Sequence, residues 1–515
     1  MMRRLCKNIW IVLLALFSIS CNDWLDIEQE GEVEADKLFS TGEGYRVVLN
    51  GLYKSLGSGQ LYGNNLSFGM LDCMSQQYEL TTTVNEDPLF MAFADFKYND
   101  NNARQLIDGV WLAGFKVIAG ANDLIQRIQL ASADLFEFGE MERSLILGEA
   151  YACRALVHFD MLRLFAPSLV NDDNGVYVPY VKEYPNIHAT SIKVVPFLEN
   201  VIGDLVEAKK LVAVYDTTDA GRKMSASAAS RTSLAPSGNF EYGDFFAGRG
   251  YRLSYYSITA LLARVYQYAG KQKEAFDCAT EVLNYGVDRE GAFYSDNFDG
   301  VKSGKEGATV DIFVQKSDLK QKSNLIFAAY NKKGYEDWNL GIYFKPDGSS
   351  AGSYFFPVKK LELFINRGVN EWQTDYRSKY MLYTPDKKNF FVSGKWFVNT
   401  TDPLNSEHLK ISPIIRLTEM KYIVAEYYAL QNQFGEAYKV LDEIRKERGL
   451  DSKLEVQNSF DGFVEDLLTD ARREWISEGQ LFYLYKRLDA EFLKGGKEHK
   501  LTKQEACLPL PNNQK

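Results

Sequence analysis

The sequence has few of the residues that build metal centres and catalytic triads. It has four histidines, far apart and in no metal-binding or triad-like motif: His158, His188, His408 and His499. Apart from Cys6 and Cys21, its cysteines also lack metal-ligand spacing, and we interpret them as free thiols: Cys73, Cys153, Cys278 and Cys507. We therefore expect no metal and no cofactor.

Clustered positive charge is absent as well. The chain has 59 Lys and Arg against 69 Asp and Glu, a formal charge of −10 over 515 residues. Binding of a nucleic acid requires a basic patch, so we expect no nucleic-acid partner. The apolar run Ile9–Phe17 has about half of the roughly 20 residues that span a bilayer as a helix.

That apolar run follows Arg3, Arg4 and Lys7 and is followed by small residues and Cys21. A basic start, a short apolar middle and small residues before a break are typical of a secretory signal peptide, here residues 1–20. Cys21 then becomes the lipidated first residue of a bacterial lipoprotein, and residues 21–35 form a tether. The alternative is an ordinary cleavage site that happens to precede a cysteine.

Most of the remaining chain has helical periodicity. The pattern is clear over about 103–130, 141–162, 192–212, 251–285, 413–447 and 460–490. Segments 260–276 and 422–438 align at a constant offset of 162, which matches Ala263 with Ala425 and Glu274 with Glu436. The pattern looks like the tetratricopeptide repeat, in which small residues let paired helices approach closely. We expect a mainly α fold with tetratricopeptide-like helical pairs, a scaffold that presents surfaces.

The texture changes between about 286 and 404, where Gly, Ser, Asn, Asp and Lys are frequent and aromatic residues persist. We expect residues 36–515 to form one domain, with a helical core (36–285 and 405–490) and a loop-rich ligand-binding subdomain (about 286–404). A shorter stretch of similar character covers 76–100. Long loops in a compact domain are often functional.

Aromatic rings with polar neighbours suit a sugar, which has an apolar C–H face and polar edges. The segment "YEDWN" (335–339) has this composition. Our candidate ligand contacts come from these loops: Trp338, Tyr335, Asn339, Tyr78, Tyr98 and Trp372. The alternative is that these rings fix loops to the helical body.

A catalytic function has little support in the sequence. The glycine-rich "GSGQLYG" (57–63) follows an expected helix rather than a strand, so it does not qualify as a phosphate-binding loop. Acidic residues are plentiful, so a carboxylate pair for glycoside hydrolysis stays possible, but no pair is singled out. We expect a binding protein, not an enzyme.

Five further segments together resemble the SusD/RagB family of Bacteroidetes nutrient-uptake lipoproteins. They are "VWLAGFKVIAGANDLIQRI" (110–128), "GEAYACRALVHFDMLRLF" (148–165), "IIRLTEMKYIVAEYY" (414–428), "LDEIRKERGL" (441–450) and "ARREWISEGQLFYLYKRL" (471–488). The chain departs from the family pattern at Asp442 and Tyr485, among other positions. Charged residues in the matching segments read best as a buried ion network that fixes helix register: Arg416, Glu419, Arg472, Glu474 and Glu478.

The resemblance implies a cell-surface lipoprotein of the bacterial outer membrane, anchored through Cys21. Such a protein captures an oligosaccharide or polysaccharide and passes it to a SusC-like TonB-dependent transporter. Family sites map to regions equivalent to 76–100 and to the stretch after Phe327. Three alternatives stay open: the same scaffold importing peptides, a glycoside hydrolase, and a lid that binds only the transporter.

Overall fold

The computed structural model describes residues 36–511 except 81–86, 187, 235–242, 288, 290, 303–317, 345–355, 385–389 and 399–402. The expected signal peptide, Cys21 and the tether lie outside the described residues. Within the described ranges, no helix is both long enough and apolar enough to cross a membrane.

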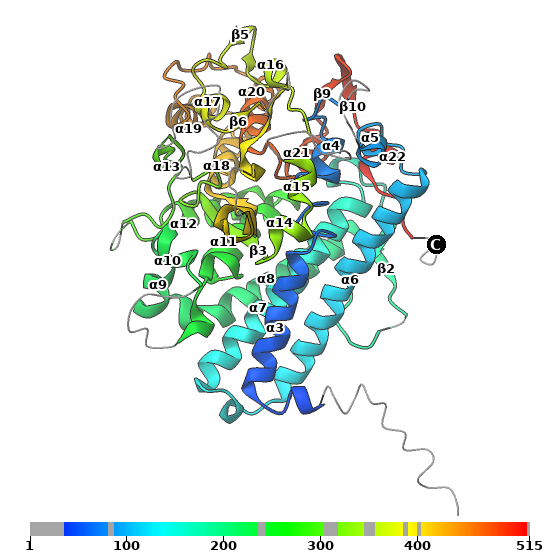
Figure 1. The fold of residues 1–515 in the computed structure, drawn as a ribbon, viewed down its shortest axis with the longest axis vertical. Coiled ribbons are helices and arrows are strands. Elements are labelled where there is room, and N and C mark those ends of the chain that lie inside the picture. The colour runs from blue at the N-terminus through cyan, green and yellow to red at the C-terminus, as the bar shows by residue number, and fades with distance from the viewer. Residues whose placement is uncertain are drawn as a thin grey trace, which may run out of the picture.

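Four long helices form one half of the molecule, the lower half in Figure 1. They are α3 (Gly42–Leu56), α6 (Asn101–Leu130), α7 (Gly139–Phe165) and α8 (Val194–Asp216). The helix α7 packs against α6 and α8. Its side chains are buried almost continuously from Ser144 to Phe165, so α7 is a central helix with no solvent face.

The charged side chains of α7 are therefore paired inside the protein. Glu149 is fully buried and accepts hydrogen bonds from Arg249 Nη1 and Arg252 Nε, both at 2.8 Å. Burial alone would raise the pKa of Glu149, but Arg252 and Arg249 outweigh it and lower that pKa. A buried carboxylate stays charged only with such partners.

The repeat predicted from sequence is confirmed by the helix boundaries. α11 (Tyr255–Tyr268) and α18 (Leu417–Leu430) begin and end 162 residues apart, and so do the starts of α12 (Gln272–Leu283) and α19 (Phe434–Glu447). The turn between the helices holds Gly270 at φ 71° in one pair and Asn432 at φ 58° in the other. These residue types adopt positive φ most readily, so the equivalent turns close in the same way.

Two of the expected helices are interrupted. Residues 411–416, partly inside the expected 413–447 helix, form strand β8 (Ile411–Arg416) before α18 begins. The expected 460–490 helix is divided into α20 (Phe460–Glu474) and α21 (Leu481–Leu488), because Ser477 and Gly479 between them have positive φ. The helical periodicity of the sequence continues across both breaks, so the sequence did not predict them.

The loop-rich part is joined to the helical core by β3 (Leu325–Tyr330), which pairs antiparallel with β8 through Ala329↔Ser412 and Tyr330↔Ile411. The other strands form two-stranded antiparallel pairs: β1 (Val176–Pro179) with β2 (Ser191–Lys193), β4 (Ile365–Asn366) with β5 (Val369–Asn370), β6 (Leu382–Tyr383) with β7 (Val392–Ser393), and β9 (Glu491–Lys494) with β10 (Lys497–Lys500). Short helices complete the chain: α4 (Met70–Met74), α5 (Pro88–Ala94), α9 (Asp219–Ser225), α10 (Ala228–Arg231), α13 (Asp299–Lys302), α14 (Gly334–Asp337), α15 (Leu340–Tyr343), α16 (Lys360–Leu363), α17 (Tyr376–Tyr380) and α22 (Lys503–Ala506).

The expected ion network exists and is larger than predicted. Arg416 pairs with Glu478 at 2.5 Å and Arg264 with Glu419 at 2.6 Å, all four side chains being buried. Glu474 pairs with Arg448 at 2.6 Å and with Arg377 at 3.1 Å. The prediction for Arg472 needs correction, because the next residue, Arg473, is the buried partner and pairs with Glu371.

Candidate functional site

The segment that contains "YEDWN" is fixed to the helical core by Trp338. This side chain is fully buried, and its Nε1 donates a hydrogen bond of 2.8 Å to the backbone oxygen of Gly57. Its indole lies against Gly63, where a Cβ atom would come within 2.0 Å of Nε1. The loop "GSGQLYG" thus forms the surface against which this tryptophan packs. We call residues 331–343, which Trp338 holds in place, the dividing segment.

The structure contradicts the prediction that Trp338, Tyr78 and Tyr98 offer ring faces to a ligand. Their exposed fractions are 0%, 3% and 6%. Tyr78 stacks on Phe356 with ring centroids 4.8 Å apart, and its hydroxyl donates to Phe68 O at 2.9 Å. The Tyr98 hydroxyl donates to Glu505 O at 2.7 Å. These rings fix loops, as the alternative interpretation had it.

The other three candidates differ from one another. Tyr335 and Trp372 are half-buried, pack against the core, and do not line the cleft described next. Asn339 is exposed and has φ 56° and ψ 32°, directly before α15. Of the six predicted residues, Asn339 is the one that the structure places in this candidate site.

A cleft of about 730 Å³ lies beside the dividing segment, within the range of roughly 300–1,000 Å³ that is usual for ligand sites. Its walls come from the loop after α3, the start of α5, the first turns of α6 and the dividing segment. We call it the amide cleft after six of its lining side chains: Gln60, Asn64, Asn65, Asn102, Gln105 and Asn339.

Two carboxylates and two rings complete the amide cleft. Asp87 caps α5 by accepting from Leu89 N at 3.0 Å, and it also accepts from the Tyr343 hydroxyl at 3.2 Å. The Tyr343 ring meets Phe90 edge-on, with centroids 5.7 Å apart. The second carboxylate, Asp337, lies at the end of α14.

The amide cleft is equipped for a neutral polyol. Each carboxamide offers both donors and acceptors, and each carboxylate accepts, so the lining can match hydroxyl groups in either direction. None of the described residues that line the cleft is a Lys, Arg, His or Cys. Within the described ranges, no group of His, Cys, Asp and Glu is suited to a metal ion.

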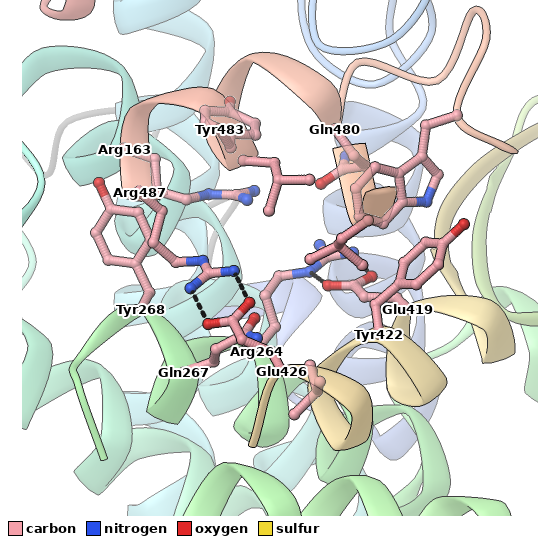
Figure 2. Close-up of a pocket in the computed structure, with 14 residues that line it drawn as sticks. Arg163, Arg264, Gln267, Tyr268, Glu419, Tyr422, Glu426, Gln480, Tyr483 and Arg487 are labelled. Atoms are coloured by element: carbon pink, nitrogen blue, oxygen red, sulfur yellow. Dashed lines mark hydrogen bonds and ion pairs between the residues drawn. The ribbon is translucent and has the colours of Figure 1, made fainter. Parts of the chain in front are cut away.

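Another cavity, shown in Figure 2, is structural. It lies where α11 and α18 face α20 and α21, and its volume is about 40 Å³, enough for roughly three water molecules. Its charges are already paired, Arg264 with Glu419 and Arg487 with Glu426 through contacts of 2.6 Å (Figure 2). This cavity is too small for a sugar, and its ion pairs fix the two helical repeats.

Two of the four segments that line the amide cleft lie in regions predicted from sequence, but most of its amide side chains do not. The predicted regions 76–100 and 286–404 contain Asp87 and Asn339, whereas Gln60, Asn102 and Gln105 lie outside them. The one available signal was the dense amide and glycine content of "GSGQLYGNN" (57–65). Close approach depends on those glycines, since a Cβ at Gly59 would come within 2.9 Å of Asp337 O.

No family model matches this sequence. A curated relative, SusD-like protein P2 of Formosa agariphila, is 23% identical over 212 residues, a segment that spans 39% of this chain and 37% of the relative.

Solved structures match over most of the chain. A SusD superfamily protein of Bacteroides thetaiotaomicron has a TM-score of 0.66 at 20% identity and covers 92% of this chain and 97% of its own. A SusD-like carbohydrate binding protein of Bacteroides vulgatus has 0.64 at 16%, covering 92% and 95%. Surface glycan-binding protein A of B. thetaiotaomicron, in complex with laminarihexaose, has 0.63 at 15%, covering 92% and 97%. The chain therefore has the fold of the SusD superfamily.

Proposed function

We propose that the protein binds a glycan in the amide cleft without cleaving it. The observation that carries this proposal is the composition of that cleft, in which six carboxamides, two carboxylates and two rings from distant segments surround about 730 Å³. A few well-buried contacts dominate binding in such a site. We expect a dissociation constant in the micromolar to millimolar range, roughly −8 to −4 kcal/mol.

Two proteins of the same fold support the choice of a glycan. One is named a carbohydrate binding protein, and the other a surface glycan-binding protein whose structure holds laminarihexaose. Identity to both is 16% or less, so the particular sugar is not carried over.

The wider role that we propose is capture at the cell surface. The protein would be anchored to the bacterial outer membrane through lipidated Cys21 and would deliver its ligand to a SusC-like TonB-dependent transporter. This part rests on the signal sequence and on the family resemblance.

Native affinity electrophoresis through gels that contain a panel of polysaccharides tests the binding. We would compare the protein with an Asn102→Ala/Gln105→Ala variant, because both side chains are exposed on the cleft side of α6. The control is Gln373→Ala/Asn458→Ala, two exposed amides in other loops. We expect one polysaccharide to retard the protein and the control, but not the cleft variant. Retardation of all three proteins alike would exclude the amide cleft.

The same polysaccharides test for hydrolysis. Asp87 and Asp337 line the cleft and are the carboxylates that a glycosidase would use. We expect no release of reducing sugar. Release that an Asp337→Asn variant abolishes would make the protein a glycoside hydrolase. Absence of binding to every polysaccharide would favour peptide import or a lid that binds only the transporter.

A further inference from the structure

A second cleft lies along the dividing segment and has a different charge. It has a volume of about 680 Å³ and lies between α3, the 244–252 turn, β3 and residues 331–333. Asp337 lines both clefts, so the dividing segment is a shared wall. We call this second site the lysine cleft.

Three lysines surround the lysine cleft: Lys54 at the end of α3, and Lys332 and Lys333 after β3. All three are exposed, and none has an ion-pair partner among the described residues. The fourth cation, Arg252, is already committed to Glu149 through a contact of 2.8 Å. The cleft therefore offers three uncommitted positive charges.

Two carboxylates oppose these lysines. Asp337 accepts a hydrogen bond of 2.8 Å from Asn331 Nδ2, and Asp244 is exposed on the opposite wall. Among the described residues that line each cleft, the uncommitted charge of the lysine cleft is thus positive by one, whereas the amide cleft has two carboxylates and no cation. The two sites differ by three charges across one segment, in a chain whose net charge is −10.

Aromatic rings form part of the same surface. Tyr330, at the end of β3, is half-buried, and its ring lies 5.0 Å from that of Tyr251 at an angle of 41°. The Phe245 ring is already covered by two guanidinium groups, those of Arg252 at 4.3 Å and Arg46 at 4.7 Å. The half-buried ring of Tyr330 beside ammonium groups matches a sugar ring that carries an acidic substituent.

We propose that the lysine cleft is a second carbohydrate subsite, one that binds an acidic sugar residue through its carboxylate or sulfate group. The inference rests on the proposed glycan binding and names the ligand class: a glycan with acidic residues. Ammonium groups around one opening repel each other, and an anionic group between them converts that repulsion into attraction.

The test is calorimetric titration of the purified protein with three oligosaccharides: neutral laminarihexaose, an oligogalacturonate that carries carboxylates, and a chondroitin sulfate hexasaccharide that carries both acids. The lysine-cleft variant is Lys332→Gln/Lys333→Gln. The control is Lys271→Gln/Lys453→Gln, which removes the same charge from exposed positions outside the cleft. Thermal unfolding would check that all the variants are folded.

We expect an acidic oligosaccharide to bind the lysine-cleft variant about tenfold more weakly than it binds the control. Its affinity should also fall as salt is added, because exposed charges are screened. Binding of oligogalacturonate identifies a carboxylate site, whereas binding of chondroitin sulfate alone, lost when its sulfates are removed, identifies a sulfate site. Either result supports the inference.

Other results would overturn it. If the lysine-cleft variant and the control bind every acidic oligosaccharide with equal affinity, the lysine cleft is not a binding site. The proposal of glycan binding in the amide cleft is then unaffected. Binding of laminarihexaose alone has the same meaning. If no oligosaccharide binds and the polysaccharide gels also show no retardation, both proposals fail. Lysine-dependent binding of an oligoglutamate, with no sugar bound, would replace the acidic sugar with an acidic peptide.

Discussion

The ion network of the helical core and the two clefts use the same kinds of side chain in opposite ways. In the core, Glu474 accepts from Arg448, Arg377 and Thr418, and every one of these groups is buried. In the lysine cleft, Lys332 and Lys333 are exposed and lack such partners among the described residues. A polar group whose bonds are satisfied inside the protein fixes the fold, and one left open to solvent is available to a ligand.

This contrast predicts that core charges govern stability and cleft side chains govern binding. The largest effect is expected from Glu474→Gln. Burial alone would raise the pKa of Glu474, but Arg448 and Arg377 hold it well below its ordinary value, so the carboxylate is charged at neutral pH. Its neutralisation removes the carboxylate that pairs with buried Arg448, whereas Arg377 keeps Asp375 and Asp470, and urea unfolding should show a loss of about 3–5 kcal/mol.

Glu465→Gln is the matched control for that variant. It lies on the same helix, α20, and pairs with Arg367 at 3.0 Å, but its side chain is 62% exposed. An exposed pair contributes about 1 kcal/mol at most. Similar losses in the two variants would contradict the distinction between core and surface charges.

Trp338→Ala tests the boundary between the two kinds of region, because Trp338 lies in the core but positions the wall of both clefts. Removal of a buried indole should lower the free energy of unfolding by about 3–4 kcal/mol and weaken glycan binding together with it. Asn102→Ala/Gln105→Ala should leave stability within about 0.5 kcal/mol. Loss of binding by Trp338→Ala at unchanged stability would mean that its ring contacts the sugar.

A smaller effect, at acidic pH, is expected from His408. Burial lowers its pKa to about 4, and the neutral ring is held between Phe397 O at 2.8 Å and Ser406 Oγ at 2.9 Å. Between pH 6.5 and 4 the unfolded chain binds the proton that the folded chain excludes. Stability therefore falls as the pH falls through this window, by up to about 3 kcal/mol.

Urea unfolding at pH 7 and at pH 4.5 measures this effect. His408→Gln should lose less stability than the natural protein over that interval, and exposed His188→Gln should lose the same amount as the natural protein. An unchanged pH dependence in His408→Gln would assign the acid sensitivity to other groups.

The scaffold could be predicted from sequence because packing repeats itself. Ala263 and Ala425 are both fully buried at equivalent helix crossings, and the same offset of 162 residues recovers the turns at Gly270 and Asn432. The ion network was predictable from the charged residues of the two segments that contain Arg416 and Glu478, although Arg416 ends strand β8 and Glu478 lies in the break between α20 and α21.

The candidate site was predictable only by region. Trp338 and Asn339 are neighbours in a segment of mixed aromatic and polar residues, yet one is fully buried and the other exposed. Composition does not show which ring will be buried against a glycine-lined surface, as Trp338 is against Gly57 and Gly63. The three groups of cleft amides, from 60–65, from the start of α6 and from Asn339, are brought together by tertiary packing, so no single local pattern identifies all six.

The buried anchor at Trp338 has a consequence for how ligand preference can change. The dividing segment is held from its inner side, where a Cβ at Gly334 would come within 2.7 Å of the indole ring. Its outer side chains are all exposed: Lys332, Lys333, Glu336, Asp337 and Asn339. Four of them line the two clefts, Lys332 and Lys333 the lysine cleft, Asn339 the amide cleft and Asp337 both. Substitutions at these four positions would therefore change the lining of both clefts while the residues of the core stay the same.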